Sequence, residues 1–185
     1  MNTGVVSRRY AKALLAYAKT VNKEDKVYQE MKRLATYFDR VDDLRHAVEN
    51  PVLDVQTKLK LLHEAAGGAN VSDELMRFFS LVLEEKREKF LQFMTWSYID
   101  LYREDKNILI GKLMTAVPSP KLEDYLKKSL SKSNNNATIE LDTKVDSELI
   151  GGYIVEVAGY RMDASVANQL KRVKQQFIAK NRRII

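Results

Sequence analysis

Apolar side chains recur at helical spacing through the first hundred residues. In the first segment, five of them fall at i, i+3, i+4, i+7 and i+11 and so define one helix face: Tyr10, Ala13, Leu14, Tyr17 and Val21. A second apolar line runs beside the first: Ala11, Leu15 and Ala18. One line is enough to join a core, so this helix is expected to pack inward and still leave an apolar face uncovered.

The pattern predicts five more helices before residue 106, over about 27–38, 44–48, 55–66, 73–83 and 90–102. Their ends carry ordinary signals. Asp54 is a candidate N-cap, Gly67-Gly68 supplies a positive-φ stop, and Ser72 opens the fifth helix with two acids in its first turn. The run 84–89 is charged throughout and is expected to form a turn.

The fifth helix is apolar almost all round, as is normal for a central helix. A domain of about 105 residues has little room for two central helices. The first and fifth helices together are therefore expected to be under-covered by the rest of the domain.

The period changes after residue 106. A strand is expected from Ile108 to Val117, stopped by Pro118, followed by a helix that begins at Ser119-Pro120. Alternating residues 137–142 predict a second strand, and 153–158 a third, which opens after Gly151-Gly152 and is turned by Gly159-Tyr160. The last helix places four apolar residues on one face, which we expect the domain's own core to need: Val166, Leu170, Val173 and Phe177.

These patterns predict a mainly α protein, with an N-terminal six-helix bundle over 1–106 followed by a small α/β domain over 107–185. The 185 residues include no cysteine, which excludes disulfides and thiolate metal sites. No apolar run approaches the roughly 20 residues of a membrane span. The N-terminus also lacks the apolar core of a secretory signal, so the mature protein is expected to begin here.

The net charge of +6 is unevenly spread. Residues 107–185 carry 13 Lys/Arg and 8 Asp/Glu, whereas 1–106 carry 18 and 17. No acid follows Asp163, but six basic residues do: Lys171, Arg172, Lys174, Lys180, Arg182 and Arg183. Such an end is either a solvated helix face or a contact for an acidic protein, a nucleic acid or an anionic membrane. Because its basic positions interleave with core-type residues, protein binding is favoured over nucleic acid and membrane.

Candidate chemistry is missing from the sequence. The Walker A, dinucleotide-binding and zinc-protease motifs do not occur. His46 and His63 lie on different predicted helices without ligand-spaced partners, which favours surface or cap roles. Gly151-Gly152 precedes a strand rather than a helix, which favours a turn over a phosphate cradle, and 163–165 is better explained as a helix cap than as a nucleophile. We expect no catalytic residue, metal or cofactor.

Three stretches of the chain resemble the delta subunit of bacterial F-type ATP synthases, the family of the mitochondrial oligomycin-sensitivity-conferring protein. Residues 9–18 (RYAKALLAYA) look like the family's opening helix, and 78–87 (FFSLVLEEKR) like its fifth helix and the turn beyond. Most specific is LIGGYIV at 149–155, followed by MDASVANQL at 162–170. Ala164 stands where the family commonly has Gly, and Tyr160 where an acidic turn residue often sits.

The resemblance implies a non-catalytic stator subunit that links the catalytic head to the b subunits of the peripheral stalk and resists rotor torque. It implies that the six-helix bundle receives the N-terminal helix of an alpha subunit between the first and fifth helices. The implied groove residues are Tyr10, Ala13, Leu14 and Tyr17 on one wall, and Phe78, Leu81 and Val82 on the other.

The second domain would then bind the b subunits, at the cytoplasmic face of the bacterial membrane, with membrane association only through the complex. Two other classes of protein stay open at this point. A generic helical adaptor would share the helices with two apolar lines, and a nucleic-acid-binding protein would use the basic last helix.

Overall fold

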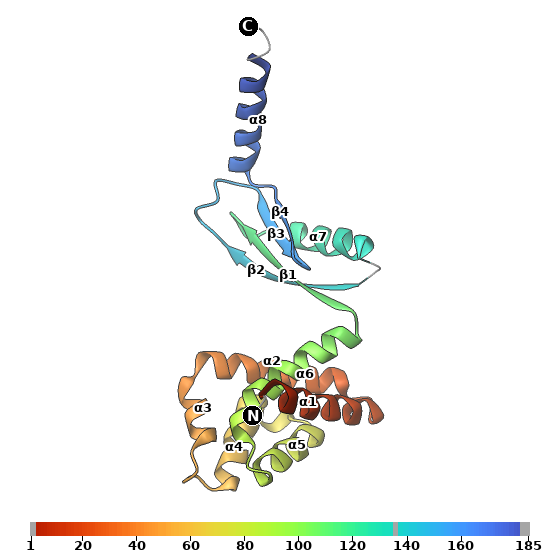
Figure 1. Ribbon diagram of the computed structural model, residues 1–185, viewed down its shortest axis with the longest axis vertical. Helices are drawn as coiled ribbons and strands as arrows, with labels where there is room; N and C mark the ends of the chain where they lie inside the picture. Colours follow the sequence, from red (N-terminus) through yellow and green to blue (C-terminus); the bar gives the residue numbers. More distant parts are fainter. Residues whose placement is uncertain (1–2, 135–136, 182–185) are drawn as a thin grey trace. The chain divides into compact units, whose positions relative to one another are not determined.

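The computed structural model describes residues 3–134 and 137–181, and the chain divides into two compact units, Met1–Asp105 and Lys106–Ile185 (Figure 1). The described part of the first unit is helical. Its elements are α1 (Thr3–Thr20), α2 (Glu24–Arg40), α3 (Asp42–Glu49), α4 (Val55–Ala66), a 3-10 turn at Gly68–Asn70, α5 (Asp73–Glu84), a second at Glu88–Phe90, and α6 (Leu91–Asp105). The expectation of a mainly α chain with a small sheet near its C-terminus is confirmed.

The ends of α4 and α5 follow from local chemistry. Asp54 caps α4, because its carboxylate accepts a hydrogen bond from the Thr57 backbone N–H at 3.1 Å. Gly67, at a φ of 138°, ends the same helix. Ser72 occupies the N-cap position of α5 as predicted, but its side chain does not cap the helix. Its hydroxyl instead donates to the carboxylate of Glu30 on α2.

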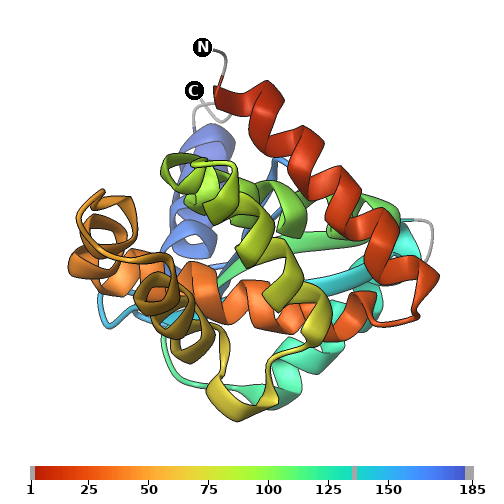
Figure 2. The ribbon, with the colours of Figure 1, turned by 90° about the horizontal axis from the view of Figure 1, so that it is seen from below.

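The core of the first unit lies between α6 and the two helices that it packs against, α1 and α2. Apolar side chains of all three are buried, and the Tyr28 and Tyr102 rings stack with their centroids 4.1 Å apart. Helix α5 lies beside α1 (Figure 2). The Tyr10 and Phe78 rings meet there edge to face with centroids 6.5 Å apart. Neighbouring helices therefore bury only part of the surface of α1 and α5.

The described part of the second unit is a four-stranded sheet with two helices. Its elements are β1 (Ile108–Thr115), α7 (Pro120–Ser133), β2 (Thr138–Val145), β3 (Tyr153–Val157), β4 (Tyr160–Asp163) and α8 (Val166–Asn181). The strand order is β2-β1-β3-β4: β1 and β2 are parallel and joined through α7, while the other pairs are antiparallel. Leu126 of α7 is buried against Leu113, Val155 and Val157 of the sheet.

Strand β4 was missed by the sequence analysis, which placed a turn at Gly159-Tyr160. The turn lies one residue earlier, at Ala158-Gly159, whose φ values of 50° and 80° suit a tight hairpin. Tyr160 already belongs to β4 and pairs with Val157. All four residues of β4 are exposed. Tyr160 and Met162 do alternate with Arg161 and Asp163, but the strand is at the short limit of the roughly 4–8 residues over which alternation indicates a strand.

The expected role of the last helix in the core is wrong. Leu170 and Phe177 of α8 are 60% and 66% exposed, and Val173 is 48% exposed. The leucines of α7 already pack against the inner face of the sheet, so the apolar line of α8 has no place in that core. The expected basic residues Arg182 and Arg183 lie outside the described residues. No helix in the described residues is both long and apolar enough to span a membrane.

Candidate functional site

Helices α1 and α5 run antiparallel. Three contacts along α1 show the direction: Lys23, just after its end, pairs with Glu74 at 3.0 Å, and the Tyr17 hydroxyl accepts a hydrogen bond from Arg77 at 2.9 Å. Nearer the start of α1, the guanidinium of Arg87 lies over the Tyr10 ring at 5.9 Å. The start of α1 therefore lies beside the end of α5.

A groove of about 420 Å³ runs between these two helices. Both walls have the same helical spacing, because each contributes residues at i, i+3, i+4 and i+7. The lining residues are Tyr10, Ala13, Leu14 and Tyr17 from α1, and Glu74, Arg77, Phe78 and Leu81 from α5. Six of the eight are apolar or aromatic, so the groove offers carbon surface along most of its length.

Six of the seven groove residues inferred from the sequence line this groove, and Val82 does not. Its side chain is fully buried in the core of the first unit. Successive helix residues are turned by about 100°, so Val82 points inward where Leu81 points out. Leu81 is 49% exposed.

Burial divides the lining into a floor and rims. Leu14 and Phe78 are only 3% and 7% exposed and form the floor, whereas Tyr17 is 37% exposed and stands with Leu81 at the rims. The small side chain of Ala13 lies between the two tyrosines of α1 and leaves space for an incoming backbone. This shape suits the apolar face of a helix laid between α1 and α5.

Two polar residues of the groove, Glu74 and Arg77, were missed by the sequence analysis. The side chain of Glu74 is 9% exposed, and its hydrogen bond from Lys23 holds the pKa of its carboxyl below the usual range. Arg77 is fixed by its bond to the Tyr17 hydroxyl across the groove. The signal was present, since both lie at helical spacing before Phe78 and Leu81, but charged residues were not counted with an apolar wall.

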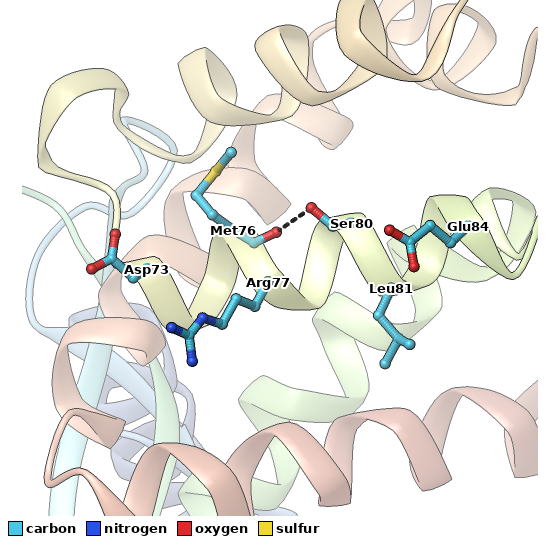
Figure 3. Close-up of a pocket in the computed structure, with 6 residues that line it drawn as sticks. All are labelled: Asp73, Met76, Arg77, Ser80, Leu81 and Glu84. Carbon is cyan, nitrogen blue, oxygen red and sulfur yellow. Dashed lines mark hydrogen bonds between the residues drawn. The ribbon is translucent and has the colours of Figure 1, made fainter.

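The outer side of α5 carries a second, shallower hollow of about 500 Å³ (Figure 3). Arg77 and Leu81 belong to both hollows and point from α5 toward α1. The remaining lining residues come from the outer face of α5: Asp73, Met76, Ser80 and Glu84. Helix α5 thus forms a ridge with the apolar groove on one side and a polar surface on the other.

The most specific sequence motif builds the start of α8. Gly152 has a φ of 80°, and a Cβ on it would lie 2.3 Å from the Ala164 carbonyl oxygen. The preceding residue, Gly151, bonds to the same segment: its carbonyl accepts a hydrogen bond from the Val166 N–H at 3.0 Å. The Ser165 hydroxyl then accepts from the Asn168 N–H at 3.3 Å, which caps the helix. The two halves of the motif therefore form one joint that sets where α8 begins.

Comparisons with known proteins agree over nearly the whole chain. The family model described as ATP synthase delta (OSCP) subunit matches residues 6–177. ATP synthase subunit delta of Phocaeicola vulgatus is 58% identical over 185 residues, with all of both chains covered. The protein of the same name from Bacteroides fragilis is 45% identical over 186 residues, again with both chains covered in full.

A solved structure shows the same fold. A chain of the Toxoplasma gondii mitochondrial ATP synthase hexamer aligns with a TM-score of 0.62 at 22% identity, over 93% of this chain and 97% of that one. The family match and the high identity to bacterial relatives decide the assignment. The chain belongs to the ATP synthase delta (OSCP) subunit family, a non-catalytic component of the peripheral stalk.

Proposed function

We propose that the groove between α1 and α5 receives an amphipathic helix from the N-terminus of an alpha subunit, and that the second unit binds the b subunits of the stalk. In this proposal, residues 1–106 act as one six-helix bundle seated on the catalytic head. Residues 107–185 act as the stalk domain. The protein then works at the cytoplasmic face of the membrane and prevents the head from turning with the rotor.

The observation that carries the first half is the exposed apolar groove between two antiparallel helices. Helix-in-groove binding uses apolar anchors at i, i+3, i+4 and i+7, and both walls of this groove repeat at that spacing. Three or four buried anchors contribute about 5–10 kcal/mol before the cost of ordering the incoming segment is subtracted. A stator needs slow dissociation more than fast association.

The direct test is calorimetric titration of the full chain with a peptide of the ~20 N-terminal residues of the cognate alpha subunit. We expect Leu81→Asp to abolish binding, because it places a charge in the groove at a side chain that is half exposed and contributes little to folding. The matched control is Val52→Asp, at an 88% exposed position between α3 and α4. Equal affinity of the two variants, or no binding by the wild type, would refute the groove assignment.

The second half is supported by the uncovered apolar line of α8. Leu170, Val173 and Phe177 lie at i, i+3 and i+7 on one face and are all about half exposed or more. Basic residues flank this line, and no acid occurs after Asp163. An acidic amphipathic helix of a b subunit would complement both the apolar line and the charge.

A soluble fragment of the b subunit tests this half. We expect Phe177→Asp to weaken binding of the fragment by tenfold or more, because it removes the aromatic anchor of the α8 line. Tyr125→Asp on α7 is the matched control, since Tyr125 and Phe177 are both 66% exposed. Loss of binding in both variants, or in neither, would exclude α8 as the contact.

A further inference from the structure

The two walls of the groove carry opposite charges. Helix α1 contains four basic residues and no acidic one: Arg8, Arg9, Lys12 and Lys19. Helix α5 contains three acids and one basic residue: Asp73, Glu74, Glu84 and Arg77. A helix docked between them would lie with one flank beside a basic wall and the other beside an acidic wall.

Several of these charges are used inside the first unit. Arg8 pairs with Glu104 at 3.3 Å, Lys19 with Asp105 at 2.5 Å, and Glu74 with Lys23 at 3.0 Å. Arg77, the exception on the acidic wall, is bonded to the Tyr17 hydroxyl.

Four charged side chains are left for a docked partner. Within residues 3–134 and 137–181, the structure shows no ion pair for Arg9 and Lys12 on α1, or for Asp73 and Glu84 on α5. All four are exposed.

Helix geometry places these four charges outside the apolar lining. Arg9 lies one turn before Ala13 and so stands at the exposed edge of the α1 wall, whereas Lys12 is turned about 60° further from the groove. Asp73 and Glu84 lie on the outer side of α5 (Figure 3). Because the two helices are antiparallel, Arg9 and Glu84 belong to the same end of the groove.

We propose that the two rims select opposite charges on the flanks of the docked helix and thereby fix the direction in which it lies. Arg9 pairs with acidic residues on one flank, and Asp73 and Glu84 pair with basic residues on the other. This inference rests on the proposed function, because it specifies how that groove chooses and orients its occupant.

The physical reason is that an apolar line alone does not define a direction. The same apolar face can be buried with the helix running either way along the groove. Turning the helix end for end, with the same apolar face against the groove, exchanges its two flanks. In the wrong direction, each rim therefore faces a flank of like charge. Each exposed pair changes affinity by about 1.5- to 5-fold, so two or three pairs together favour one direction by about twofold to a hundredfold.

The test uses two synthetic amphipathic peptides of ~20 residues with one common apolar line, a helix about 30 Å long. The first carries acids on one flank and bases on the other, and the second has the flanks exchanged. Each peptide bears a fluorophore at its N-terminus. The full chain bears the partner dye on Thr20→Cys at the end of α1, a unique site because the sequence has no cysteine.

We expect high energy transfer for one peptide and low transfer for the other, with the difference lost at high salt. The double variant Arg9→Glu/Glu84→Lys keeps the net charge but leaves charges of both signs on each side of the groove, so the difference between the two peptides should be lost. Asp39→Lys/Lys60→Glu, an equal exchange of exposed charges away from the groove, should leave them unchanged.

Equal energy transfer for both peptides, or a difference in transfer that the double variant leaves intact, would overturn this proposal. The assignment of the groove as a helix-binding site would still stand. If neither peptide binds while the alpha-subunit peptide does, charge selection as described is also overturned. If no peptide binds at all, the proposed function fails, and this inference fails with it.

Discussion

Glu30 accepts two hydrogen bonds from Ser72: one from its backbone N–H at 2.8 Å and one from its hydroxyl at 2.5 Å. Both residues are buried, Glu30 on α2 and Ser72 at the N-cap of α5. The carboxylate of one helix thus satisfies the first donors of another. This link fixes where α5 begins, and α5 is one wall of the groove.

Replacing Glu30 tests the strength of this link. Glu30→Ala leaves the two Ser72 donors buried without this acceptor, so we expect the free energy of unfolding of the first unit to fall by about 2–4 kcal/mol. Glu30→Gln keeps one carbonyl oxygen and should cost about half as much. Urea unfolding followed by fluorescence of the single tryptophan, Trp96 on α6, measures both values. A loss of less than about 1 kcal/mol in Glu30→Ala would show that the hydrogen bonds contribute little.

The Lys23–Glu74 pair predicts a pH dependence of stability. The hydrogen bond from Lys23 lowers the pKa of Glu74 below its usual value of 4.5, so at acidic pH the unfolded chain binds more protons than the folded one. The stabilisation is complete above pH 4.5 and is lost as the pH falls through the lower folded pKa. Urea midpoints between pH 7 and 3 should show a steeper acid decline in the wild type than in Lys23→Met. Identical declines would rule out this pair as a source.

The joint before α8 predicts different costs for two glycines with the same φ of 80°. Gly159→Ala meets no atom within 4 Å and should cost only the left-handed strain of about 1–2 kcal/mol. Gly152→Ala adds a collision with the Ala164 carbonyl oxygen and should cost clearly more. Hydrogen exchange of the β3 amides reports the stability of the second unit in each variant. Equal exchange rates would mean that the close approach is relieved without cost.

Periodicity was sufficient to predict the apolar walls of the groove, because each wall repeats its residues at helical spacing. It could not separate Leu81 from Val82 on a helix that is apolar almost all round, since only the position of the neighbouring helices decides which side is covered. It also predicted that α8 packs into the core of its own domain, because an amphipathic pattern predicts a buried face without showing which molecule buries it. Strand β4 was missed because four residues are too few to establish a period, and Glu74 and Arg77 were missed because neither residue is apolar.

Two adjacent residues of α5 provide the sharpest test of how groove and core are divided. Val82→Ala removes fully buried carbon atoms, so we expect it to lower the free energy of unfolding by about 1–3 kcal/mol. It should leave the affinity for the alpha-subunit peptide nearly unchanged. Leu81→Ala removes a half-exposed side chain of the groove and should do the opposite, with less than about 0.5 kcal/mol lost in stability. Its affinity for the peptide should fall about tenfold or more.

Urea unfolding and calorimetric titration give the free energy of unfolding and the peptide affinity of each variant. If Val82→Ala weakened binding as much as Leu81→Ala, the incoming helix would have to reach past the α5 rim, and the wall as described here would be wrong.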